Sequence, residues 1–180
     1  MDIFILGNGL SRKAFRVSKL QKYGMVIGCN ALYRDGTPDI LVAVDRPMIR
    51  EIEESGYEGQ VVAPGPDVKK PFKYSGYLAM QEAVRHNPST VYLIGFDYDG
   101  NPSTSKLKRA RKTGSNIYWG SKNYKTLPTP ELFKQRQTIE RKFIVDNPQT
   151  RFIRVINEYS SPVSLGCMNI TIPALLSRLK

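Results

Sequence analysis

Short apolar runs recur along the chain, and most of them end in glycine, asparagine or aspartate. The first run, residues 3–6, is Ile-Phe-Ile-Leu and is followed by Gly7. Uninterrupted apolar runs of this length, rich in β-branched residues, are typical of strands buried on both faces of a sheet. The pattern predicts buried strands at residues 3–6, 25–30, 40–44 and 91–94, a short strand at residues 60–64 and a last strand at residues 152–156.

Between these runs, apolar residues follow helical spacing. The predicted helices cover residues 47–55, 75–85, 129–145 and 173–179, and residues 11–23 form either a surface helix or an irregular connection. Strands that alternate with helices imply a mostly parallel sheet with helices on both faces. We therefore expect an α/β, Rossmann-like fold that forms a single domain over residues 1–180.

A glycine turn follows the first strand, in the order Gly7-Asn8-Gly9-Leu10-Ser11. The two glycines permit a tight turn in which main-chain N–H groups approach a ligand closely, and Ser11 is placed to cap a helix. A strand, a glycine turn and a helix start together favour a site for a phosphate or a nucleotide ribose. The alternative is a strand-to-helix turn that binds no ligand.

Polar residues also follow the other predicted strands. In a parallel sheet, ligands bind at the carboxyl ends of the strands. The residues that this rule gathers at one edge are Asn8, Ser11, Asn30, Asp45, Arg46, Asp97 and Asp99. Their convergence predicts one site, although each of the aspartates is also suited to capping a strand end.

Composition limits the kinds of partner and mechanism that the protein can have. The chain has 27 basic and 16 acidic residues and a net charge of +11, which favours an anionic partner such as a nucleotide, a nucleic acid or an acidic glycan. The single histidine, His86, excludes mechanisms that need two, and Cys29 and Cys167 lack metal-type spacing. No apolar run approaches the ~20 residues of a membrane span, so we expect a cytoplasmic protein without a membrane span.

Residues 100–130 contain no acidic residue. This stretch is far longer than an ordinary connection of about 4–6 residues, and we interpret it as a basic lid loop. Its basic and aromatic residues are Lys106, Lys108, Arg109, Arg111, Lys112, Lys122, Lys125, Tyr118, Trp119 and Tyr124. Such a loop can meet phosphates and stack on bases, or it can be a solvated loop.

The serial order of these motifs resembles the bacterial sialyltransferases that cap lipooligosaccharides. The similarity runs from about residue 2 to about residue 165 and rests on the glycine turn, Cys29-Asn30, Tyr74-Ser75-Gly76, residues 92–97 and residues 118–123. The first half is also similar to the 6-hydroxymethylpterin diphosphokinase-like family, through the glycine turn, Pro38-Asp39 and Asp45.

The first resemblance implies an inverting, metal-independent transfer from a cytidine-monophosphate sugar. It implies that Asn8, Asn30 and Ser75 hold the nucleotide and that Tyr98 and Tyr118 hold the leaving phosphate. Tyr98 is one position out of register with the family. The family's general-base histidine is missing, because Gly120 is followed directly by Ser121. A general base contributes ~10²–10⁴-fold to a rate, so its loss implies a changed reaction, another base or no reaction. Asp97, Asp99 or Asp45 could replace it.

The first functional hypothesis is therefore a glycosyltransferase-like enzyme. Its predicted catalytic residues are Asp97, Asp99 and Tyr118, and its predicted nucleotide-binding residues are Gly7, Asn8, Gly9, Ser11, Asn30, Asp45, Ser75 and Tyr98. The alternative is a non-catalytic nucleotide- or nucleic-acid-binding protein on the same fold. Diphosphate transfer, with Mg²⁺ on Asp45, Asp97 or Asp99, is a third hypothesis.

Overall fold

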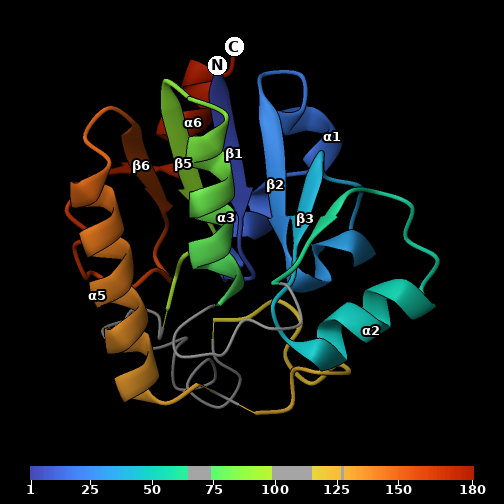
Figure 1. Ribbon diagram of the computed structural model, residues 1–180. Helices are drawn as coiled ribbons and strands as arrows, with labels where there is room; N and C mark the ends of the chain where they lie inside the picture. The colour runs from blue at the N-terminus through green and yellow to red at the C-terminus, as the bar shows by residue number, and fades with distance from the viewer. Residues whose placement is uncertain (65–73, 99–114, 127) are drawn as a thin grey trace.

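A computed structural model describes residues 1–64, 74–98, 115–126 and 128–180 of the chain. Its centre is one parallel sheet with helices packed on it (Figure 1). In spatial order the strands are β4 (Val61–Val62), β3 (Ile40–Val42), β2 (Met25–Cys29), β1 (Asp2–Leu6), β5 (Thr90–Ile94), β6 (Arg151–Ile156) and β7 (Met168–Thr171). The predicted α/β class and parallel sheet are confirmed.

β1 is the middle strand of the sheet, and its apolar run is therefore buried on both faces. It pairs with β2 on one side, where Phe4 lies opposite Val26, and with β5 on the other, where Phe4 lies opposite Tyr92. Residues 3–6 are fully buried. The order reverses at β1, since the chain builds β2, β3 and β4 to one side and then returns to place β5 on the other. Such a reversal is where open α/β sheets bind ligands.

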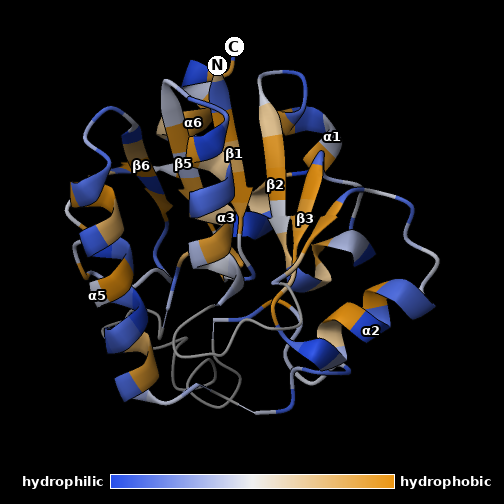
Figure 2. Cartoon of the chain, viewed as in Figure 1, coloured by the Kyte–Doolittle hydropathy of each residue, from blue (hydrophilic) through white to orange (hydrophobic). Residues whose placement is uncertain are grey.

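Helices cover both faces of the sheet. Ile3 and Ile5 pack in one cluster with Ala79, Met80 and Ala83 of α3 (Ser75–Arg85), which α5 (Pro130–Asp146) also joins. The alternate residues of β1 face a second cluster, to which α1 (Val17–Leu20), α2 (Arg46–Glu54) and α6 (Ile172–Arg178) contribute. Figure 2 shows mainly apolar strands and helices that carry both polar and apolar residues.

The helix boundaries follow local signals. α3 is the predicted 75–85 helix, while α2, α5 and α6 differ from prediction by one residue at each end. Thr129 caps α5, because its side chain accepts a hydrogen bond from the N–H of Leu132. The cap position of α3 is Tyr74, and Ser75 is the first helical residue.

Two expectations about the elements need correction. β7 was not predicted, because Met-Asn-Ile-Thr is short and three of its four residues are exposed at the sheet edge. The 11–23 stretch is split into a 3-10 helix, η1 (Leu10–Ala14), and the single-turn α1. η1 begins before Ser11, so Ser11 does not cap it.

Of the predicted lid loop, residues 100–114 and 127 lie outside the described residues, while residues 115–126 form a described segment. In the described part of the chain, no helix is both long enough and apolar enough to cross a membrane.

Candidate nucleotide site

A pocket of about 230 Å³ opens at the carboxyl edge of the sheet. Its walls come from the turn after β1, the end of β2, the start of α3, the residues after β5, the 115–126 segment and one side of α5. The predicted site residues that line it are Gly7, Asn8, Gly9, Asn30, Asp45, Ser75 and Tyr98. The structure therefore brings together residues that lie up to 91 positions apart in the sequence.

Asn8 contributes an amide to this pocket. Its Nδ2 donates a hydrogen bond to the hydroxyl of Tyr124 at 2.8 Å, and its main-chain oxygen accepts from the N–H of Ile117 at 2.8 Å. The side-chain oxygen Oδ1 is buried and has no hydrogen-bond partner within residues 1–64, 74–98, 115–126 and 128–180. A buried amide oxygen without a partner costs about 1–3 kcal/mol, so this atom is available to a ligand donor.

Asn30 has the same arrangement on the next strand. Its backbone is left-handed, with φ +52°, a conformation that asparagine tolerates better than most residues. Its Nδ2 donates to the Ser75 hydroxyl at 2.9 Å, and its Oδ1 is buried with no partner in the part of the chain that the structure describes. Cys29 beside it is buried, and burial raises the pKa of its thiol to about 12, so the sulfur is a poor nucleophile.

The glycine turn continues the pairing of β1 with β5. The N–H of Gly7 donates to the carbonyl of Ile94 at 2.8 Å, and the N–H of Gly9 donates to the carbonyl of Gly95 at 2.9 Å. The approach is so close that a Cβ on Gly9 would lie 2.6 Å from that carbonyl oxygen. These two N–H groups are therefore used inside the protein, which corrects the expectation that they approach a ligand.

Ser11 and Asp97 form a buried pair behind the turn. The Ser11 N–H donates to Asp97 Oδ2 at 2.7 Å, and Ser160 donates to Asp97 Oδ1 at 2.6 Å. The Ser11 hydroxyl accepts from the N–H of Gly95 at 3.0 Å. Burial raises the pKa of Asp97, while its hydrogen bonds from Ser11 and Ser160 oppose that rise. Neither residue lines the pocket, and both tie the turn to β5.

Tyr118 also lies outside the pocket lining. Its hydroxyl donates to Asp35 and accepts from the Arg12 guanidinium at 2.7 Å. Burial, together with Asp35, raises the pKa of Tyr118. The side chain thus anchors the 115–126 segment to η1 and to the end of η2 (Asn30–Arg34). Asp99, the remaining predicted catalytic residue, lies outside the described residues.

A polar cluster at the α5 end of the pocket was not predicted. Glu140 is 1% exposed and accepts hydrogen bonds from the hydroxyls of Tyr74, at 2.6 Å, and Tyr98. Burial raises the pKa of Glu140 to about 7, against the opposing effect of both tyrosines and Arg154. The Tyr98 hydroxyl therefore donates its hydrogen bond to Glu140. The backbone of Tyr98 is left-handed, with φ +56°.

Arg136 lies one turn before Glu140 on α5 and lines the same pocket. Its guanidinium carbon is 5.0 Å from the centre of the Tyr74 ring, and its Nε is buried and finds no partner in the described ranges. Sequence reasoning missed both residues because they lie on a helix rather than at a strand end. The available signal was the spacing of Phe133, Glu140 and Ile144, which places an acid on a stripe that faces the protein.

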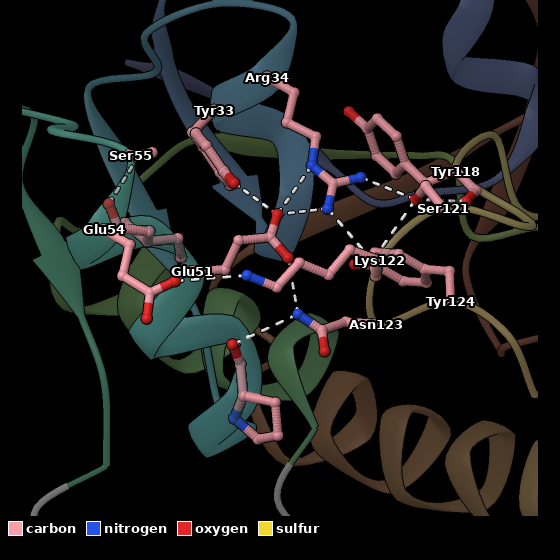
Figure 3. A network of polar contacts seen from close by, with 12 residues as sticks. Tyr33, Arg34, Glu51, Glu54, Ser55, Tyr118, Ser121, Lys122, Asn123 and Tyr124 are labelled. Carbon is pink, nitrogen blue, oxygen red and sulfur yellow. Dashed lines mark hydrogen bonds and ion pairs between the residues drawn. The ribbon is translucent and has the colours of Figure 1, made fainter.

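A network of polar contacts fixes the 115–126 segment beside the pocket (Figure 3). Glu51 of α2 accepts hydrogen bonds from Tyr33 and Arg34 on one oxygen and from Asn123 on the other. Arg34 also donates to the Ser121 hydroxyl at 2.8 Å. These contacts position Tyr124, whose hydroxyl meets Asn8.

Among the described residues, no three His, Cys, Asp or Glu side chains are grouped closely enough to hold a metal ion. Comparison of the chain with protein-family models, with curated proteins and with solved structures found no match.

Proposed function

We propose that the pocket binds the nucleoside part of a nucleotide sugar and that the protein is a glycosyltransferase-like enzyme. The observation that carries the proposal is the pair of buried amide oxygens in one pocket, Asn8 Oδ1 and Asn30 Oδ1, neither of which has a partner among the described residues. Two such acceptors call for a ligand with several N–H or O–H donors. A ribose and a nucleobase with an amino group supply them.

The position of the pocket supports the same ligand. It lies at the carboxyl ends of β1 and β2, beside the strand where the sheet order reverses. Nucleotides bind at this point in open α/β sheets. The sequence resemblance to sialyltransferases, which singles out Asn8, Asn30 and Ser75, agrees with this placement.

In the proposed reaction, an acceptor hydroxyl attacks the anomeric carbon of the sugar. The bond from that carbon to the phosphate oxygen breaks, its electron pair leaves with the phosphate, and the anomeric centre inverts. A carboxylate must accept the hydroxyl proton. Of the three aspartates predicted for this role, Asp45 is the described one that lines the pocket and is exposed. We therefore assign the proton-accepting role to Asp45.

The second candidate is a non-catalytic nucleotide- or nucleic-acid-binding protein. It is favoured by the partners of the two tyrosines that were predicted to hold the leaving phosphate. The hydroxyls of Tyr98 and Tyr118 both donate to carboxylates of the protein, Glu140 and Asp35. The net charge of +11 suits a nucleic acid.

The proposal is tested first by thermal unfolding with a panel of nucleosides, nucleotides and nucleotide sugars. A ligand that binds only the folded state at a hundredfold excess over Kd raises stability by about 2.7 kcal/mol. We expect a shift that is lost in Asn8→Ala and Asn30→Gly. It should persist in Asn169→Ala, which removes an exposed asparagine of β7. No shift with any member of the panel would contradict a nucleotide pocket.

Turnover separates the two candidates. Release of nucleotide from a nucleotide sugar, dependent on Asp45, supports the enzyme. Binding without release, or salt-sensitive binding to an oligonucleotide alone, supports the second candidate.

A further inference from the structure

If the pocket binds a nucleotide, some group in it must bind the phosphate. The main-chain N–H groups of Gly7, Gly9 and Ser11 in the glycine turn do not do so, because they already donate hydrogen bonds inside the protein. The N–H groups of Gly7 and Gly9 donate to the carbonyls of Ile94 and Gly95, and that of Ser11 donates to Asp97. A phosphate on a bound nucleotide must therefore be received by other groups that line the pocket.

Arg136 is the one cationic side chain among the described residues of the pocket lining. It is half-buried, its Nε has no hydrogen-bond partner among the residues that the structure describes, and stacking on Tyr74 holds the guanidinium in place. Within the described ranges, it forms no ion pair with an acidic side chain. A fixed guanidinium with free donors is suited to the geometry of a phosphate.

Glu140, the acidic residue one turn after Arg136 on α5, forms no direct ion pair with the Arg136 guanidinium within the described residues. The two oxygens of Glu140 are occupied by the hydroxyls of Tyr74 and Tyr98. Burial raises the pKa of Glu140 to about 7, so a substantial part of the population is uncharged near neutral pH. The charge of Arg136 acts on Glu140 from a distance and lowers the pKa of that carboxyl, but within the described residues the guanidinium is not held in a direct ion pair.

The first turn of α3 adds a second feature that favours anions. Tyr74, Ser75 and Gly76 line the pocket, and the side chain at the cap position, Tyr74, makes no capping hydrogen bond to a described residue of this helix. The helical hydrogen bonds of α3 begin with the N–H of Leu78, which donates to the carbonyl of Tyr74 at 3.2 Å. A helix N-terminus carries a partial positive charge, and Arg136 stacks on the residue at its cap position.

We propose that Arg136, with the first turn of α3, is the phosphate subsite of this pocket and gives it a preference for nucleotides over nucleosides. This inference rests on the proposed function and names the residue that holds the phosphate. In a transfer reaction the same guanidinium would neutralise the departing phosphate. The role would belong to an arginine of α5 instead of to the tyrosines that the resemblance implies.

The test compares each of the four common ribonucleosides with its 5′-monophosphate by calorimetry on the full chain. In the wild type we expect the monophosphate of the preferred base to bind at least tenfold more tightly than the nucleoside. Arg136→Gln should weaken monophosphate binding by about 10- to 100-fold, the range for a hydrogen bond to a charged group, and change nucleoside binding by less than twofold. Arg136→Lys should lie between the wild type and Arg136→Gln.

Arg141→Gln is the matched control, because this arginine lies on the same helix and its guanidinium donates to the carbonyl of Ser164 at 2.6 Å, outside the pocket. It should bind both ligands as the wild type does. A wild-type measurement covers the case in which the Arg136 variants do not fold: inorganic phosphate should compete with the monophosphate and leave nucleoside binding unchanged.

Equal affinity of the wild type for nucleoside and monophosphate would overturn the inference and leave the nucleotide pocket standing. So would equal losses for the two ligands in Arg136→Gln, or inorganic phosphate that competes with neither. Failure of every nucleoside and nucleotide to bind would overturn the proposed function and this inference together.

Discussion

The amide of Asn30 donates a hydrogen bond to the hydroxyl of Ser75 across 2.9 Å and thereby joins the end of β2 to the first turn of α3. Both residues line the pocket. The two residues are 45 positions apart in the sequence. The hydrogen bond fixes the Nδ2 end of the Asn30 amide, and this orients Oδ1, which has no partner among the described residues. We therefore regard it as a contact that shapes the site.

We expect a double-mutant cycle to detect this contact as a coupling of about 0.5–1.5 kcal/mol in the free energy of unfolding. The variants are Asn30→Gly, which keeps the left-handed backbone accessible, Ser75→Ala, and the pair. Urea unfolding measures the three changes. A parallel cycle of Asn30→Gly with the distant Asn169→Ala should be additive. Additivity in both cycles would mean that the Asn30–Ser75 bond contributes nothing.

Asp97 should act on stability rather than on ligand binding. Its carboxylate accepts hydrogen bonds from the Ser11 N–H and the Ser160 hydroxyl and is 1% exposed. Asp97→Ala leaves both donors without a partner, and we expect a loss of about 2–4 kcal/mol in the free energy of unfolding. The matched control is Asp45→Ala, an exposed aspartate of the pocket, which should change stability by less than about 0.5 kcal/mol.

Nucleotide affinity, measured under conditions in which both variants are folded, should be close to wild type for Asp97→Ala. If Asp97→Ala instead kept full stability and lost all binding, Asp97 would be a ligand-contacting residue and its structural role would be wrong.

The fold could be predicted from the sequence because strands buried in a parallel sheet consist of continuous apolar runs. Residues 3–6 and 91–94 are of this kind, and they became β1 and β5 at the centre of the sheet. β7 was not accessible, since an edge strand that leaves Met168 exposed needs no apolar run. Its place depends on pairing with β6, which is a long-range contact.

The site could be predicted only in part, for a related reason. A strand end determines which residues reach the carboxyl edge, and Asn8 and Asn30 did reach the pocket. The position of a residue at a strand end does not determine whether its side chain points toward solvent or into the protein. Ser11 and Asp97 point inward, where the Ser11 N–H donates to Asp97 and the Ser11 hydroxyl accepts from the N–H of Gly95. Arg136 enters the pocket from a helix that packs beside it, which strand-end reasoning does not reach.

Glu51 should hold the 115–126 segment in place through Arg34 and Asn123 (Figure 3). Burial opposes its ionisation, but hydrogen bonds from Tyr33 and Arg34 outweigh this and lower the pKa of Glu51. We expect Glu51→Gln to cost about 2 kcal/mol in the free energy of unfolding, because it leaves a partly buried guanidinium without its counter-charge. Glu53→Gln, an exposed position on the same helix, is the control.

The same variant has a local readout. The N–H of Gly120 donates to the carbonyl of Tyr124 at 2.9 Å within the 115–126 segment. Hydrogen exchange at Gly120 should be faster in Glu51→Gln than in wild type, while exchange in β1 should follow only the global loss of stability. Because the pKa of Glu51 is lowered in the folded state, its contribution is present above its ordinary pKa of 4.5 and is lost as the pH falls through the lower, folded value. Unchanged exchange at Gly120 would show that other contacts hold the segment.

Glu140 should make stability fall as the pH rises toward neutrality, which is the opposite sign to Glu51. Burial raises its pKa from the ordinary value of 4.5 to about 7. Between these values the unfolded chain has released the proton and the folded chain still holds it, so raising the pH favours unfolding. The difference of about 2.5 pKa units corresponds to a penalty on the order of 3 kcal/mol, complete above pH 7 and absent below pH 4.5.

Glu140→Gln removes this titration and keeps the shape of the side chain, so the difference in free energy of unfolding between variant and wild type isolates the group. We expect that difference to shift in favour of Glu140→Gln by up to about 3 kcal/mol as the pH rises from 4.5 to 7.5. Urea unfolding at closely spaced pH values measures it, and Glu53→Gln should show no comparable trend. A difference that is independent of pH over this range would mean that Glu140 has the same pKa in the folded and unfolded states, and that Tyr74 and Tyr98 compensate fully for its burial.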